Sequence, residues 1–209
     1  MALSNYTTIA TALEKWLNRE GFASITDNAE EFIIAAQRRI QREVRIPPME
    51  TVTTLTVTAQ TEPVPTDLLE VIDLVLVGTN RNCHLERQTW DSIVENTDTG
   101  EPRFFGRAGA NFWFAPTPTS ATVKLFYYKE LPFISTTNAT NWFSTYAPEL
   151  ILSAAQVEAY IFLQDDARAG LINNKFESEK ALLMAQANKD EYSSNSRIRE
   201  EGIRLHGAP

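Results

Sequence analysis

The sequence predicts an α+β protein: a helical bundle formed by N-terminal and C-terminal helices, an inserted antiparallel β-module and a flexible C-terminal tail. Three observations predict it. Apolar residues recur at helical spacing in the first and last thirds, Thr, Val and aromatic runs separated by turn residues fill the middle, and the final residues lose both patterns. We therefore expect the bundle from residues 1–47 and 144–192, the module from residues 48–143 and the tail from residues 193–209.

The first expected helix contains Ile9, Leu13 and Trp16 at helical spacing and stops near Gly21. A second helix follows, because Asp27 is suited to cap a helix and Glu30 lies three residues later. Its apolar stripe consists of Phe32, Ile33, Ala36, Ile40 and Val44.

A double proline, Pro47-Pro48, ends this second helix near Arg45. Each proline lacks a backbone donor, and the residue before a proline is pushed toward extended geometry. The architecture is therefore expected to change from helix to strand at this point.

The middle third is expected to form short strands with turns between them. The expected strands are residues 51–60, 69–77, 104–105, 112–114 and 123–128. Gly106 to Gly109 is expected to be the turn of a hairpin, and residues 88–95 one or two turns of helix. No long helix separates the strands, so antiparallel pairing is expected throughout.

The last third returns to helical spacing. Pro148 is suited to the first position of a helix. A wide apolar stripe runs from Leu150 to Phe162, Gly170 is expected to interrupt it, and Phe176 begins the apolar stripe of a further helix. Residues 193–209 cannot bury enough apolar surface to fold alone, so they are expected to form a tail that is either frayed or ordered by a partner.

Composition restricts the function. The chain has 209 residues and a formal net charge of -8, which argues against a surface that grips phosphates as a whole. Its single cysteine cannot form an internal disulfide. The start of the chain lacks a signal-peptide pattern, and no apolar run reaches the ~20 residues that span a bilayer. We expect a soluble protein made in the cytoplasm, without a membrane partner.

Catalytic and metal-binding patterns are missing from the sequence. Cys83 and His84 lie together in an expected loop, without the second ligand pair that a metal site needs, and the other histidine is His206. Asp165 and Asp166 are adjacent, so on a helix they point about 100° apart and do not share a site. No glycine-rich phosphate loop occurs. We expect no enzyme, metal or cofactor, and a hydrolase built around His84 is only a formal alternative.

Four arginines on the second helix, Arg38, Arg39, Arg42 and Arg45, are the main candidates for an interaction site. A solvated helix face is the simplest interpretation of such a charge pattern. A contact with a neighbouring subunit is the next, and binding to nucleic acid is the third.

The order of several short motifs resembles the head-to-tail adaptor (connector) proteins of tailed bacteriophages. The resemblance spans most of residues 5 to 190, and its value lies in order and spacing. The motifs are Trp16-Leu17-Asn18-Arg19, Ala36 to Arg45, Met49-Glu50, Val64 to Leu68, Leu125 to Tyr128 with Pro132, Asn141-Trp142-Phe143, Pro148-Glu149-Leu150 and Glu158 to Asp166.

This resemblance implies a structural virion protein at the head–tail junction, synthesised in the host cytoplasm. Twelve copies would form a homo-oligomeric ring beneath the portal protein, serve as a platform for the next tail or nozzle protein, and let DNA pass without sequence-specific binding. Arg38, Arg39, Arg42 and Arg45 are then expected to contact a neighbouring subunit. In the tail, Arg197, Ile198, Arg199 and Arg204 are expected to dock on the portal. The alternative is a nucleic-acid-binding accessory protein that uses the helix from Arg38 to Arg45.

Overall fold

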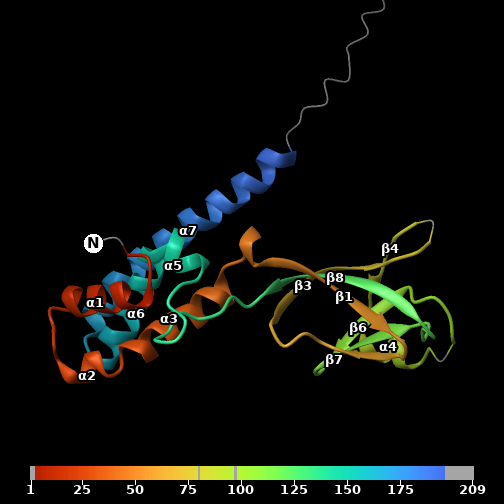
Figure 1. Cartoon of the computed structure of the whole chain (residues 1–209), viewed down its shortest axis with the longest axis horizontal. Helices are drawn as coiled ribbons and strands as arrows, with labels where there is room; N and C mark the ends of the chain where they lie inside the picture. The colour runs from red at the N-terminus through yellow and green to blue at the C-terminus, as the bar shows by residue number, and fades with distance from the viewer. Residues whose placement is uncertain (1–2, 80, 97, 196–209) are drawn as a thin grey trace, which may run out of the picture.

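The computed structural model describes residues 3–79, 81–96 and 98–195. Helices occupy both ends of the chain and strands occupy its middle (Figure 1). The elements are α1 (Tyr6–Trp16), α2 (Ala23–Thr26), α3 (Ala29–Glu43), η1 (Pro47–Met49), β1 (Glu50–Val57), β2 (Thr61–Pro63), β3 (Leu68–Leu76), β4 (Cys83–His84), β5 (Glu86–Arg87), α4 (Trp90–Val94), β6 (Phe104–Ala108), β7 (Asn111–Ala115), β8 (Ala121–Lys129), α5 (Trp142–Tyr146), α6 (Pro148–Phe162) and α7 (Asp166–Asn195).

The molecule has two ends of different composition. Helices α1, α3, α5 and α6 gather at one end, the strands and α4 gather at the other, and α7 projects from the helical end (Figure 1). Each end has its own cluster of buried apolar side chains. The predicted α+β class is therefore confirmed.

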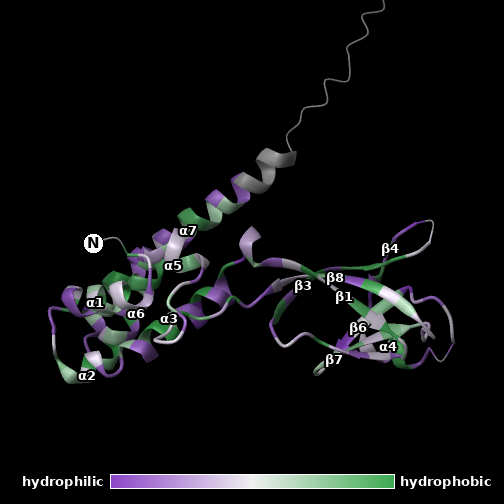
Figure 2. Ribbon diagram, viewed as in Figure 1, coloured by the Kyte–Doolittle hydropathy of each residue, from purple (hydrophilic) through white to green (hydrophobic). Residues whose placement is uncertain are grey.

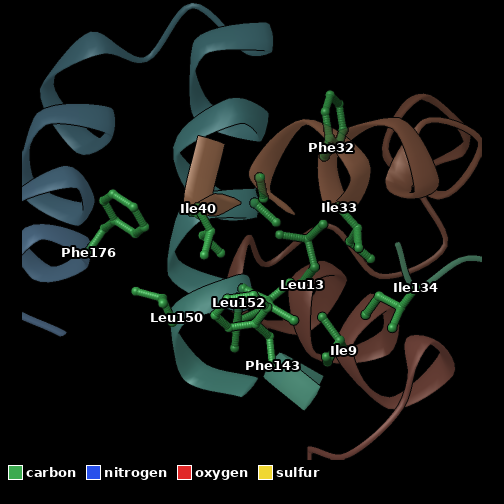
Figure 3. Packing of buried hydrophobic residues seen from close by; sticks show 14 of the residues in the cluster. Ile9, Leu13, Phe32, Ile33, Ile40, Ile134, Phe143, Leu150, Leu152 and Phe176 are labelled. Atoms are coloured by element: carbon green, nitrogen blue, oxygen red, sulfur yellow. The ribbon is translucent and has the colours of Figure 1, made fainter. Parts of the chain in front are cut away.

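The helical core is built on the stripe of α3. Ile33, Ala36, Ile40 and Val44 are fully buried and Phe32 nearly so, as predicted, and they pack against α1 and α6. Phe176 reaches this core from α7, on the far side of Ile40 in Figure 3. Burying the larger of these side chains stabilises the bundle by roughly 1.5–3 kcal/mol each, and the methyl group of Ala36 contributes less.

The start of α3 differs from the prediction. Asp27 does not cap it: a short extra helix, α2, ends at Asp27, whose N–H donates to Ala23 O. Asn28 is the N-cap residue of α3, and its side chain makes no capping bond. The predicted capping box is therefore wrong, because Asp27 is the C-cap residue of the preceding helix.

Two four-stranded sheets make up the other end. One has the order β1-β8-β3-β4 and the other β2-β7-β6-β5. Phe105, Phe112 and Phe114 of the second sheet are buried against Leu74 and Leu125 of the first. All named strands pair antiparallel except β5 and β6, which are parallel, so the expectation of antiparallel pairing throughout was wrong for that pair.

The predicted hairpin is present as β6 and β7, but its turn is shorter than expected. Gly106 lies within β6, and the turn contains Gly109, whose φ of +60° suits glycine. A Cβ on Gly106 would lie 2.8 Å from Ile93 Cδ1, so α4 can pack against the strand only at a glycine. α4 itself falls within the predicted stretch of residues 88–95.

The C-terminal helices differ from the prediction in the position of the break between them. Pro148 occupies the first turn of α6 as predicted, but Gly170 does not interrupt the following helix. The break lies at Gln164, which has a φ of +57°, and Asp165 Oδ1 then accepts a bond from Arg168 N at the start of α7. α7 continues through Gly170, where an added Cβ would meet nothing within 4 Å.

α7 continues to Asn195, beyond the predicted start of the tail at residue 193. The tail residues Arg197, Ile198, Arg199 and Arg204 lie outside the described residues. The domain boundaries stay a prediction, and the burial of Leu131 and Ile134 in the helical core favours a boundary near residue 130 rather than 143.

Candidate assembly surfaces

The four arginines of α3 divide into two pairs. Arg39 turns toward α7, where its guanidinium donates to Asn173 Oδ1 at 2.7 Å, lies 3.3 Å from Glu177 Oε1 and stacks 4.4 Å from the centroid of the Phe176 ring. Arg45, just after the helix, donates to Glu70 Oε2 of β3 at 3.0 Å. These two arginines already have partners within the chain.

Arg38 and Arg42 are exposed and lie one helical turn apart. The Arg38 guanidinium lies 5.7 Å from the centroid of the Phe133 ring. Among the described residues, no acidic side chain pairs with either arginine. α3 therefore exposes two arginines without an acidic partner, half of the four that the sequence suggested. This weakens the interpretation as a nucleic-acid-binding helix, because affinity rises with the number of phosphates neutralised.

An ion cluster joins α3 to α7 beside Arg39. Lys180 of α7 contacts both Glu43 and Glu177, and Arg39 contacts the same two carboxylates. Burial alone would raise the pKa of Glu43, but Lys180 and Arg39 outweigh it and hold that pKa below its usual value. Burial would lower the pKa of Lys180, yet Glu177 and Glu43 raise it overall. The cluster fixes α7 against the bundle.

Two buried glutamines of α3 were missed in the sequence. Gln41 pairs with the backbone of Leu131 in both directions, Nε2 donating to the carbonyl at 2.9 Å and Oε1 accepting from the N–H at 2.7 Å. Gln37 pairs in the same way with Ile134 and also accepts from Asn141 Nδ2. Their spacing of four residues beside the apolar stripe was the only available signal. They attach the segment that returns from β8 to the bundle.

Apolar side chains are exposed on two further surfaces. On the outer face of the first sheet, Val52, Ile72 and Phe126 are 53%, 47% and 37% exposed across neighbouring strands β1, β8 and β3. On α7, Leu171 and Leu182 are 69% and 72% exposed. Hydrophobic and hydrophilic residues alternate along this projecting helix (Figure 2). The neighbouring apolar side chains on the sheet face are a candidate surface for contact with another protein, whereas Leu171 and Leu182 lie eleven positions apart on α7 and are exposed singly.

His84 lies on β4 and not in a loop, contrary to expectation. Its Nδ1 is 2.5 Å from Asp73 Oδ2, and its side chain is largely exposed. Within residues 3–79, 81–96 and 98–195, no group of three His, Cys, Asp or Glu side chains could hold a metal ion. No helix in the described part of the chain is both long and apolar enough to cross a membrane.

The helical bundle presents exposed arginines on α3, and both the bundle and the two-sheet module expose apolar side chains, an arrangement that suits a protein that acts through contacts with other macromolecules. A family model described as the SU10 adaptor protein matches residues 4–199. The chain belongs to the SU10 adaptor protein family. No curated protein matches it.

The family is one of phage adaptors, so the chain is a structural component of the virion at its head–tail region. The resemblance to head-to-tail adaptors is confirmed. The family is a structural one and is not known for catalysis. Adaptors associate with other virion components, such as portal and tail proteins.

Proposed function

We propose that this chain is the adaptor that joins the portal to the tail and that it works as a ring of twelve copies. The family match over residues 4–199 is the observation that carries this proposal. The two-ended shape supports it, because the helices and the sheets can contact different neighbours (Figure 1).

Arg38 and Arg42 are the residues we propose for contact with carboxylates of the adjacent subunit. Both are exposed, and among the described residues no acidic side chain forms an ion pair with either of them. Arg39 and Arg45 are less available, since a contact with a second copy would have to displace Glu177 and Glu70. We infer that these two hold α3 in place and that the outer pair makes the contact.

The tail supplies the proposed contact with the portal, through Arg197, Ile198, Arg199 and Arg204. Arginine forms paired hydrogen bonds with carboxylates, so acidic or carbonyl groups on the portal are the expected acceptors. The downstream tail or nozzle protein would then bind the opposite side of the ring.

DNA would pass through the ring without sequence-specific contacts. The net charge of -8 supports this role, because a lumen that attracted phosphates strongly would retain the genome. A nucleic-acid-binding accessory protein requires affinity that falls steeply with salt. We expect filter binding with duplex DNA to detect no such affinity at moderate salt.

Negative-stain electron microscopy of the full chain mixed with its portal protein tests the proposal. Rings on the portal are expected, and their loss is expected after truncation at Asn195 or after the double change Arg38→Glu and Arg42→Glu. The matched control is Arg168→Glu, an exposed arginine of α7 paired locally with Asp165. A protein that binds no portal and forms no ring would refute the assignment.

A further inference from the structure

The first sheet ends in two different edges. β1 pairs with β8 over its whole length in one unbroken register, from Glu50 opposite Tyr128 to Val57 opposite Ala121. No strand borders the far side of β1 in the described part of the chain. On the other side β3 has two register shifts along its pairing with β8, and the short β4 covers its end.

Proteins usually protect such edges with bulges, prolines or charges, since an unpaired row of N–H and C=O groups accepts another strand. The β3 side has the bulges and also Glu70 and Asp73. β1 has none of these between Thr51 and Val57, where only Thr, Val and Leu occur. These residues favour strands, and the regular register leaves the groups of alternate residues pointing outward. The edge is therefore built for strand addition.

The directions of the two edge strands determine whether a second copy can pair parallel or antiparallel with this sheet. In the order β1-β8-β3-β4 every neighbouring pair is antiparallel, so the two edge strands of this four-stranded sheet run in opposite directions. A copy placed head to tail therefore brings its β4 antiparallel to β1, which is the more favourable pairing. A head-to-tail contact repeats from copy to copy, and it closes into a ring when the rotation between neighbouring copies divides a full turn.

The β4 arm is suited to act as the added strand. Its pairing with β3 continues to Leu85, whose N–H donates to Leu74 O at 2.8 Å. Gly78 lies between β3 and β4, and a Cβ there would lie 2.4 Å from Arg81 O, so the position favours glycine. In Figure 1 β4 lies at the margin of the sheets.

Charge and side-chain direction agree with this pairing. The only charge on β1 is Glu50 at its start, whereas exposed Arg81 and Arg87 flank the arm together with one carboxylate, Glu86. Antiparallel addition brings the Leu85 end of the arm toward the Glu50 end of β1, and beyond Leu85 the chain passes into β5 of the second sheet, where Arg87 pairs with Phe105.

The arm and β1 each turn one face toward the apolar cluster between the two sheets. Cys83 packs partly against the cluster between the sheets, and so does Leu55 of β1. Thr51 and Thr53 share that inner face of β1, because side chains alternate along a strand. Cys83 of the arm would therefore face Thr51 or Thr53 of the next copy.

We propose that β1 of one copy pairs with the arm Cys83–Leu85 of the next, so that the sheets of neighbouring subunits join around the ring. This inference rests on the proposed ring and names the contact that closes it. The occupant of the open edge is thus a second copy of this chain.

The single cysteine makes the contact testable by disulfide formation. Thr51→Cys and Thr53→Cys place a second thiol on the inner face of β1. After mild oxidation with copper phenanthroline, of the free protein and of the portal-bound protein, one of them should give a ladder of dimers, trimers and larger species on non-reducing gels. Thr54→Cys, one residue along and on the outer face, is the matched control and should give no ladder.

Removing Cys83 separates the alternatives. Cys83→Ser combined with whichever of Thr51→Cys and Thr53→Cys gives the ladder should abolish it, whereas dimers that persist would mean that β1 pairs with a second β1 and would overturn the proposal. Rings seen by electron microscopy without a ladder from either variant would also overturn it while leaving the proposed function intact. If neither rings nor a ladder is observed, both the proposed function and the strand pairing are overturned.

Discussion

Replacement of Gln41 by leucine should destabilise the helical end far more than a buried glutamine-to-leucine change ordinarily does. The Gln41 side chain is 1% exposed and makes two hydrogen bonds with Leu131, both buried. Leucine has nearly the same size, so the change leaves little cavity. It leaves the Leu131 N–H and C=O without partners and without access to water.

The magnitude follows from those two groups. An unsatisfied buried donor or acceptor costs about 1–3 kcal/mol, so the pair costs about 2–6 kcal/mol. For a chain of this size each kcal/mol lowers the melting temperature by about 2–4 °C, so we expect a fall of at least about 4 °C. Urea unfolding followed by circular dichroism at 222 nm measures the free energy, and a thermal scan measures the melting temperature.

Gln156 of α6 provides the matched control. It is also 1% exposed, but its Oε1 is buried without a hydrogen-bond partner. Gln156→Leu removes an unpaired buried group instead of a bonded one, so it should be neutral or should stabilise the protein. Equal losses for the two variants, or no loss for Gln41→Leu, would show that the bonds to Leu131 are not what holds the returning segment.

Three further changes have expected outcomes. Gly170→Ala should raise the unfolding free energy by about 0.4–1 kcal/mol, because the site has open space and helix is its native conformation; a loss in urea unfolding would contradict this. Gly106→Ala should lower the free energy by about 1–3 kcal/mol, because its Cβ would meet Ile93 Cδ1 at 2.8 Å; an unchanged urea midpoint would show that α4 moves aside at no cost. The pKa of Glu43 is depressed, so its contribution to stability is complete above its ordinary value of 4.5 and is lost as the pH falls below it. The urea midpoint should therefore fall more between about pH 6 and about pH 3 in the wild type than in Glu43→Gln, and equal falls would exclude Glu43 as the source.

Apolar spacing was sufficient to predict the main helices and strands. The stripe of α3 and the position of Pro148 depend on local chemistry that the sequence displays directly. Short elements were less predictable: α2 and α5 have four and five residues, too few to show a helical period. The predicted helix break at Gly170 was wrong, because a glycine lowers the stability of a helix without ending it. The actual break lies at Gln164, which has a positive φ that its residue type does not indicate.

Partners distant in the chain were the main limit on predicting the site. The sequence shows four arginines on one helix, but Arg39 finds Asn173 134 positions away and Arg45 finds Glu70 25 positions away. Gln41 likewise finds Leu131 90 positions away. A single sequence does not give these pairings, so it could not distinguish arginines that brace the fold from arginines that face outward.

The two proposed subunit contacts differ in physical kind, and salt separates them. A contact made by Arg38 and Arg42 with carboxylates is electrostatic and exposed, so it weakens when the screening length falls from about 10 Å at 0.1 M salt to about 3 Å at 1 M. Strand addition at β1 rests on backbone hydrogen bonds, which salt screens little. If both contacts operate, high salt should weaken ring assembly while the Thr51→Cys or Thr53→Cys ladder still forms from the remaining associated copies. A ladder that disappears in parallel with assembly would mean that the arginine pair alone brings the subunits together and that the strand pairing only follows.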